Sequence, residues 1–183
     1  QHAAKRLALV IGLFCGWTFD LRDLRQRLSA GLDLEAITAL DILPSHYQSL
    51  EVATTEGVKS VSLSEVSGAV RSACGYCADL TAELADVSVG SARLPLGWQE
   101  ARHWNQTVER SSAGQDLVEQ ARSAGVLTVE EPPVGALEKL KVAAAGKKRT
   151  ACRRLSELSE DPDDLLYLPR DLSKALSSSG KGA

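Results

Sequence analysis

Cysteine is the residue type whose spacing in this chain is most suggestive of chemistry. Cys74 and Cys77 are separated by Gly75 and Tyr76, so a single tight turn can direct both thiols at one metal centre. Cys15 comes at the end of an apolar segment, and functional residues of α/β proteins gather where strands end. Three thiolates from two separate segments suit a [4Fe-4S] cluster, which takes four thiolate ligands.

The spacing alone leaves other interpretations open. Structural zinc usually takes two such cysteine pairs, and this chain has one. A thioredoxin-like redox pair normally follows a strand and opens a helix at its first cysteine. Unliganded, buried thiols are a further alternative of comparable weight. A disulfide is the least favoured interpretation, because the chain shows no secretory leader and four cysteines without one suggest a reducing, cytoplasmic compartment.

Cys152 is the fourth cysteine of the chain and the remaining candidate for a metal ligand. Positive charge stabilises a thiolate, so its basic surroundings favour this role; a surface thiol on a solvated helix is the alternative. The basic run itself indicates a solvated helix face or a docking surface for an acidic partner or a cofactor phosphate. Its members are Lys147, Lys148, Arg149, Arg153 and Arg154.

The elements that must position these cysteines indicate an α/β fold, with a mixed sheet flanked by helices, a β-hairpin excursion and a C-terminal helical tail. Residues 6–15 are apolar at most positions, which is typical of a strand buried on both faces. Thr18 or Asp20 can cap a following helix. Further strands are predicted at 36–43, 86–89, 105–110 and 126–129, a hairpin at 49–63, and helices at 114–124 and after Pro133.

A charged, amphipathic segment follows Cys77. Its apolar residues alternate with Asp79, Glu83 and Asp86, which predicts helix-surface and capping roles for the three carboxylates. Their closeness to Cys77 also makes them candidates for hydrogen bonds to metal ligands. Residues 97–104 are expected to form an irregular loop, with His103 as a loop residue rather than a ligand.

Composition narrows the class of protein. The chain has 183 residues, 44% of them hydrophobic and 25% charged, as in ordinary globular proteins. We divide it into an α/β domain at 1–131 and a helical extension at 132–183 with a disordered C-terminal tail. A net charge of -3 argues against a nucleic-acid binder, and the apolar run at 7–15 is too short to span a membrane. The absence of methionine suggests that residue 1 is not the translation start.

Three stretches together resemble the C-terminal domain of the beta subunit of coenzyme F420-reducing hydrogenase and formate dehydrogenase. The resemblance covers nearly all of residues 5 to 150, and its long central string is far more specific than a bare cysteine pair. The stretches are Ile11-Gly-Leu-Phe-Cys15, Cys74-Gly-Tyr-Cys77-Ala-Asp-Leu-Thr-Ala-Glu-Leu-Ala-Asp86-Val-Ser-Val-Gly90-Ser91, and Gly97-Trp98.

The resemblance implies an iron–sulfur flavoprotein, an electron-transfer subunit that passes electrons through a [4Fe-4S] cluster to or from FAD and a two-electron acceptor such as coenzyme F420. By motif, Cys15, Cys74 and Cys77 would be cluster ligands, with a fourth that is either Cys152 or a cysteine upstream of Gln1. Much of the FAD pocket is likewise expected upstream.

The same resemblance names partners and further contacts. Arg71 and Arg93 are candidates for contacts with the flavin or a partner. The expected partners are other redox subunits of a hydrogenase, a formate dehydrogenase or a similar complex. The alternative is a non-catalytic interaction domain of the same fold, in which the cysteines bind zinc or serve packing.

Overall fold

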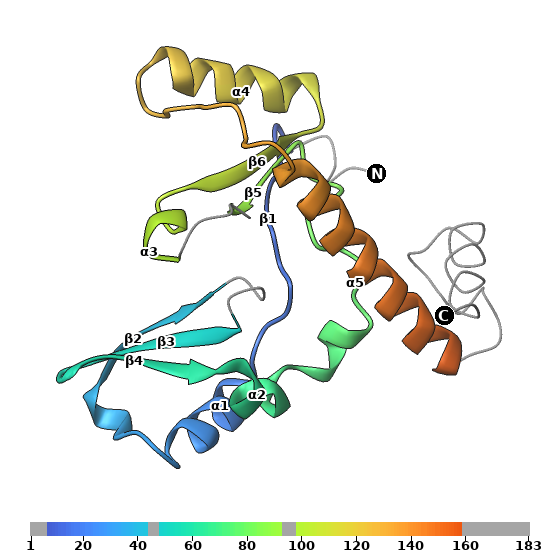
Figure 1. Cartoon of the computed structure of the whole chain (residues 1–183). Coiled ribbons are helices and arrows are strands. Elements are labelled where there is room, and N and C mark those ends of the chain that lie inside the picture. The colour runs from blue at the N-terminus through green and yellow to red at the C-terminus, as the bar shows by residue number, and fades with distance from the viewer. Residues whose placement is uncertain (1–6, 44–47, 93–97, 159–183) are drawn as a thin grey trace. The chain divides into compact units, whose positions relative to one another are not determined.

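The computed structural model describes residues 7–43, 48–92 and 98–158, drawn as a coloured ribbon in Figure 1. The chain divides into two compact units. Of the described residues, the first comprises 7–15 and those within 78–149, and the second comprises those within 16–77 together with 150–158. Each unit has a three-stranded sheet of its own. The division at 131/132 that the sequence suggests stays a prediction.

The first unit has a mixed sheet. Strands β1 (Ile11–Leu13), β5 (Val87–Ser91) and β6 (Asn105–Glu109) lie in the order β1-β5-β6. β1 pairs with β5 in parallel, and β5 pairs with β6 antiparallel. The helices α3 (Trp98–Ala101), α4 (Ser112–Ser123) and α5 (Ala136–Leu158) complete the order of elements, with the last residues of α5 belonging to the second unit.

The second unit has an antiparallel sheet with helices. Helix α1 (Leu21–Leu28) begins after Asp20, whose carboxylate accepts hydrogen bonds from two backbone N–H groups of its first turn. Strands β2 (Ile37–Ile42), β3 (Ser49–Thr54) and β4 (Gly57–Ser62) follow in the order β2-β3-β4. Helix α2 (Leu63–Val66) is followed by 3₁₀ turns at Ser67–Ala69 and Ser72–Gly75, and another lies at Leu34–Ala36.

A compact apolar core fills the second unit. Helix α1, strand β3 and the α2 region each contribute side chains to it, which explains the apolar stripe on α1 and the alternation along β3. Its buried members are Phe19, Leu24, Leu28, Leu50, Val52, Val66 and Ala69.

The predicted fold class is confirmed: the α/β chain contains a mixed sheet, helices, a hairpin and a long C-terminal helix. The hairpin predicted around Glu56-Gly57 is β3–β4, with Gly57 at a φ of +131° where a side chain would be strained. Among the described helices, none has both the length and the apolarity needed to cross a membrane.

The strand predicted at 126–129 is wrong. Gly125 takes a left-handed φ of +69°, and the N–H groups of Val126 and Leu127 both donate to the carbonyl of Ala121. This is the capped end of α4. The first N–H groups of the expected strand are therefore engaged by the preceding helix, and its apolar side chains remain exposed.

Two further expectations need correction. Residues 97–104 contain the short helix α3, and residues 79–86 are turns and bends rather than the amphipathic helix that their pattern suggested. The first strand, predicted over 6–15, spans Ile11–Leu13 within its described part. Ile11 and Leu13 are exposed, so the prediction of a strand buried on both faces is wrong for this part.

Candidate metal and cofactor site

Cys74 and Cys77 lie in and just after the 3₁₀ turn Ser72–Gly75 of the second unit. The Cys74 N–H donates to the carbonyl of Arg71 at 3.0 Å, and the Tyr76 N–H donates to the carbonyl of Ala73 at 3.1 Å. Both thiols are free of disulfides and half-buried. The local sequence therefore forms the tight turn that its spacing predicted.

The sulfur of Cys74 is hydrogen-bonded to the backbone. It accepts the Thr18 N–H at 3.3 Å, and its thiol lies 3.8 Å from the Thr18 carbonyl as a donor. Hydrogen bonds to sulfur are one of the means by which a protein sets the reduction potential of an iron–sulfur cluster. The donor chemistry of this turn thus fits a cluster.

Arg71, which precedes the same turn, is hydrogen-bonded to the backbone of residues 18 and 19. Its backbone N–H donates to the Thr18 carbonyl at 2.9 Å, and its Nε donates to the Phe19 carbonyl at 3.3 Å. A β-bridge between Phe19 and Val70 lies beside these contacts. Arg71 as a flavin or partner contact stays a prediction, and Arg93 lies outside the described residues.

Arg154 packs on the cysteine turn, which the sequence did not indicate. A methyl group built on Gly75 would collide with the Arg154 guanidinium, so the missing side chain makes room for that cation. The neighbouring Cys152 has 2% of its surface exposed. The surface-thiol interpretation of Cys152 is therefore wrong, while its role as fourth ligand stays a prediction.

Cys15 belongs to the first unit, where backbone hydrogen bonds hold both sides of the strand end. Its N–H donates to the Leu80 carbonyl at 2.8 Å, and the Phe14 N–H donates to the Val89 carbonyl at 2.8 Å. The thiol itself is exposed. The Cys15 carbonyl accepts a hydrogen bond from Lys147 Nζ at 2.5 Å.

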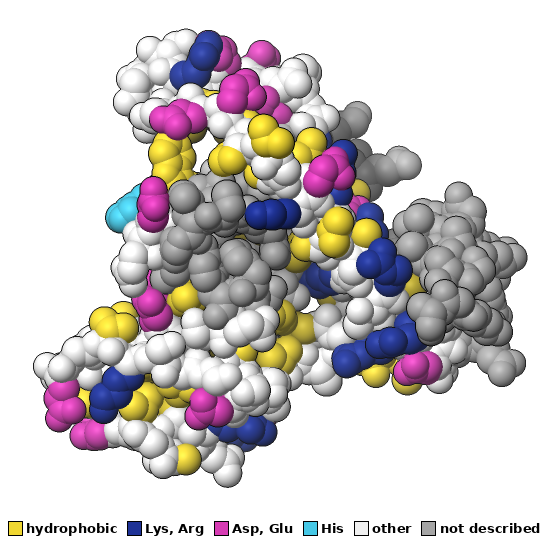
Figure 2. All heavy atoms as spheres, viewed as in Figure 1, with side chains coloured by type: hydrophobic (Ala, Val, Ile, Leu, Met, Phe, Trp, Pro, Cys, Tyr) yellow, Lys and Arg dark blue, Asp and Glu magenta, His cyan; other side chains and the backbone are white. Residues whose placement is uncertain are grey.

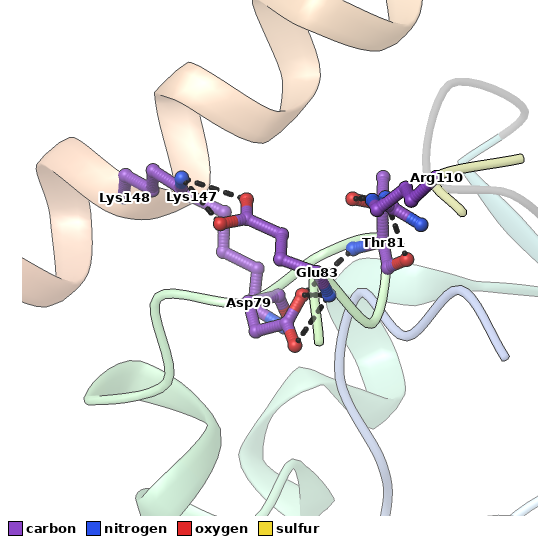
Figure 3. Close-up of polar contacts among 6 residues, drawn as sticks. All are labelled: Asp79, Thr81, Glu83, Arg110, Lys147 and Lys148. Carbon is purple, nitrogen blue, oxygen red and sulfur yellow. Dashed lines mark hydrogen bonds and ion pairs between the residues drawn. The ribbon is translucent and has the colours of Figure 1, made fainter. Parts of the chain in front are cut away.

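Lysines of α5 hold the segment that follows the cysteine pair (Figure 3). Lys147 Nζ also donates to the Asp79 carbonyl at 2.8 Å, and Lys148 Nζ lies 2.7 Å from the Glu83 carboxylate. Figure 2 shows further Lys and Arg side chains over the surface of α5. Both lysines are half-buried and bonded to this segment, whereas the three arginines of the run are exposed, as expected of a solvated face.

Hydrogen bonds to carboxylate side chains, rather than those of a helix, fix the backbone of residues 79–86. The Asp79 carboxylate accepts the N–H groups of Thr81 and Glu83 at 3.0 to 3.2 Å. The capping role predicted for Asp79 is thus confirmed, although it caps a turn. Leu84 is 98% exposed, because no helix face turns it inward.

Arg110 fixes the end of this segment to the sheet. Its guanidinium donates to the hydroxyl of the fully buried Ser88 at 2.6 Å, and to the hydroxyl and carbonyl of Thr81 at 2.9 and 3.2 Å. These contacts satisfy two hydroxyl groups that burial would otherwise penalise. Sequence reasoning did not single out Arg110, since a lone arginine after a strand gives no local signal.

Asp86 joins three elements. Its carboxylate accepts the Ser111 hydroxyl at 2.5 Å and the Val10 N–H at 2.8 Å. The Ser111 hydrogen bond first, and then the Val10 hydrogen bond, lower the pKa of Asp86 from its ordinary value. Ser111 also caps α4, so this carboxylate stabilises the start of that helix as well.

The three predicted cluster ligands are distributed over the two units, Cys15 in the first and the Cys74/Cys77 pair in the second. Within residues 7–43, 48–92 and 98–158, no three His, Cys, Asp or Glu side chains form a group able to hold a metal ion. The shared ligand set of Cys15, Cys74 and Cys77 therefore stays a prediction.

Comparison with known proteins decides the family. Residues 1–134 match the profile of the coenzyme F420 hydrogenase/dehydrogenase family that describes the C terminus of the beta subunit. The chain belongs to this family. The resemblance seen in the cysteine string is confirmed.

Relatives in methanogenic archaea agree with this assignment. The beta subunit of the coenzyme F420 hydrogenase of Methanothermobacter thermautotrophicus is 31% identical over 167 residues, which cover 87% of this chain and 55% of that protein. A subunit of the F(420)H(2) dehydrogenase of Methanosarcina mazei is 26% identical over 75% of this chain and 38% of its own length. The chain thus spans about half or less of these relatives.

A solved structure has the same fold. A chain of the F420-reducing [NiFe] hydrogenase complex from Methanosarcina barkeri, determined in a xenon derivatization study, superimposes with a TM-score of 0.67 at 25% identity. The match covers 83% of this chain and 51% of that one.

Proposed function

We propose that this protein is an electron-transfer subunit, or part of one, in an oxidoreductase complex. In this role it passes electrons through a [4Fe-4S] cluster to or from FAD and a two-electron acceptor such as coenzyme F420. Two relatives named as F420 hydrogenase and F420H2 dehydrogenase subunits support this proposal. The observation that carries it is the turn bearing Cys74 and Cys77, with half-buried thiols that are in no disulfide and a backbone hydrogen bond to the Cys74 sulfur.

We propose Cys15, Cys74 and Cys77 as cluster ligands. A [4Fe-4S] cluster supplies one-electron transfer when bound. The protein's contribution is to hold soft sulfur donors, to donate the Thr18 N–H to one of them, and to shield the turn with Arg154. These are the means by which a chain sets affinity and potential.

The covalent chain favours this ligand set. Thr18, whose N–H binds the Cys74 sulfur, follows Cys15 by three residues. Three residues of extended chain span at most about 11 Å between Cα atoms. Connectivity alone therefore keeps Cys15 in the neighbourhood of the residue that the Cys74 sulfur contacts.

FAD is proposed on the family resemblance. One open hollow of about 290 Å³ is lined by Glu109, Gln115, Val118, Glu119, Arg122 and Val129. Its single arginine is paired with Glu119 at 2.9 Å. The two carboxylates would repel the pyrophosphate of FAD, so this hollow does not suit the flavin.

The decisive experiment is anaerobic purification of the protein followed by iron, sulfide and flavin analysis. We expect a brown protein whose visible absorption is bleached by dithionite. Cys74→Ser should lose the cluster iron, because it removes one of a pair of ligands on a single turn. Cys152→Ser is the matched control, and it separates the two candidates for the fourth ligand.

Full iron content in the Cys74→Ser protein would show that the ligand assignment is wrong. A colourless protein with stoichiometric zinc would instead favour the alternative, a non-catalytic interaction domain of the same fold. We further propose other redox subunits as partners and the cytoplasm as the compartment, in keeping with a reducing environment for four thiols that form no disulfide.

A further inference from the structure

The ammonium group of Lys147 occupies an unusual position. Its Nζ donates at the same time to the carbonyl of Cys15 and to the carbonyl of Asp79, residues that lie 64 positions apart in the sequence. Figure 3 shows the side chain extending from α5 toward Asp79. Two carbonyl acceptors on one cation make charge-assisted hydrogen bonds, which are about twice as strong as neutral ones.

We propose that Lys147 is a positioning residue for Cys15. It fixes the backbone of Cys15 against Asp79 and places a positive charge beside the Cys15 thiol. This inference rests on the proposed function in one respect, namely that Cys15 is taken as a cluster ligand. The charge itself belongs to this chain and can be measured without any cluster.

The surrounding contacts make the position of the ammonium well defined. The Cys15 N–H donates to the Leu80 carbonyl, and the Asp79 carboxylate accepts the N–H groups of Thr81 and Glu83. Both residues whose carbonyls Lys147 contacts are therefore fixed by further hydrogen bonds. The ion pair between the half-buried Lys148 and the exposed Glu83 anchors the next residue of α5 to the same segment. The carbonyl oxygen and the thiol of Cys15 are covalently linked through the backbone and Cβ carbons, which keeps the sulfur within a few ångströms of the oxygen.

A positive charge at this range should act on reagents that approach the exposed thiol. An anionic alkylating reagent such as iodoacetate is attracted, whereas neutral iodoacetamide is not. The ratio of the two rates at Cys15 therefore reports the local charge, and the fraction of thiolate cancels from it. At the dielectric constant of water, a unit charge some 6 to 8 Å away changes such a ratio by about threefold.

The test uses the full 183-residue chain freed of metal, with alkylation of each cysteine followed by peptide mass spectrometry. In Lys147→Met we expect the iodoacetate to iodoacetamide ratio at Cys15 to fall by about threefold. The ratio at the half-buried Cys77 serves as the internal reference. High salt should lower the ratio in the unchanged protein, because the Debye length shortens to about 3 Å at 1 M. The ratio in Lys147→Met should not change with salt.

Two further variants separate charge from mere anchoring. Lys147→Arg keeps the cation and should keep most of the ratio. Lys148→Met removes the neighbouring anchor and should leave the ratio at Cys15 unchanged. An unchanged ratio in Lys147→Met, an equal fall in Lys148→Met, or a complete loss in Lys147→Arg would each contradict the proposal.

The cluster assignment is tested separately by the iron content of Cys15→Ser. If Cys15→Ser keeps its iron while Lys147→Met loses the charge effect, the ligand role fails and the positioning charge stands. If Cys15→Ser loses its iron while Lys147→Met keeps the full ratio, the ligand role stands and Lys147 does not act on Cys15.

Discussion

Asp86 accepts hydrogen bonds from Ser111 and from the Val10 backbone, and both favour its ionised form. The pKa of Asp86 in the folded protein is consequently lower than its ordinary value of 3.8. Its contribution to stability is present above the ordinary value and is lost as the pH falls through the lower, folded pKa. Acidification should therefore weaken the junction between β1, β5 and α4.

Asp86→Asn should reduce the free energy of unfolding at about pH 7, and the difference from the unchanged protein should narrow toward about pH 3. Urea denaturation of both proteins at several pH values measures this difference in the free energy of unfolding. Asp116→Asn, at an exposed position of α4, is the control and should change stability little. A constant Asp86→Asn deficit across the whole pH range would show that shape, rather than charge, matters at this residue.

Several of these residue contacts could not have been predicted. The capping by Asp20 followed from its place before an apolar stripe. By contrast, Lys147 binds carbonyls far away in sequence, and Arg110 binds Ser88 and Thr81 across a strand pair. Long-range contacts from flexible, charged side chains leave no periodic pattern in the sequence.

Helix α4 lies against the sheet of the first unit so closely that one of its residues has no room for a side chain. A Cβ at Gly114 would lie 2.8 Å from the Val87 side chain and closer still to the Asp86 carbonyl. Glycine is ordinarily unfavourable inside a helix by about 1 kcal/mol. Here the close packing outweighs that preference.

Gly114→Ala should therefore lower the free energy of unfolding by about 1 to 2 kcal/mol, since overpacking against backbone exceeds the gain in helix propensity. Gly146→Ala in α5 is the matched control. Its Cβ would meet only the Arg149 guanidinium at 3.9 Å, so it should raise stability by up to about 1 kcal/mol. Denaturant unfolding of both variants measures these changes in the free energy of unfolding. A stabilising effect of Gly114→Ala would contradict the close packing of α4 on Asp86 and Val87.

The sequence predicted secondary-structure elements correctly where the hydrophobic residues follow a single period. The helix stripe of α1 and the alternation of β3 and β4 predicted those elements within a residue or two. The pattern failed at 79–86 and 126–129, where hydrogen bonds to the Asp79 carboxylate and to the Ala121 carbonyl engage the backbone N–H groups. Such local competition is invisible to hydrophobic periodicity.

At the scale of the whole molecule, the two units interrupt one another along the chain, with residues 16–77 inserted into the first. The second unit has its own buried core around Leu50 and Val52. The Pro132-Pro133 pair suggested a boundary near Pro132. The insertion of one unit into the other was not foreseen, because it produces no change in composition. The number of sheets was likewise not predicted.

Leu50→Ala tests whether the units are separable in stability. Loss of this fully buried side chain should cost the second unit about 2 to 5 kcal/mol. Hydrogen exchange should then quicken in β3 and β4, while β5 and β6 of the first unit keep their protection. Val58→Ala, at a position with 66% of the residue exposed, is the control. Faster exchange in both sheets would reveal one cooperative unit.

Leu84 offers a practical opportunity, because its side chain is exposed while the N–H groups of its neighbours Glu83 and Ala85 donate to the Asp79 carboxylate and the Ala82 carbonyl. A genetically encoded fluorescent amino acid at this site would leave the four native thiols untouched. Its emission could then report, in real time, the arrival of a quenching inorganic centre or the docking of another protein.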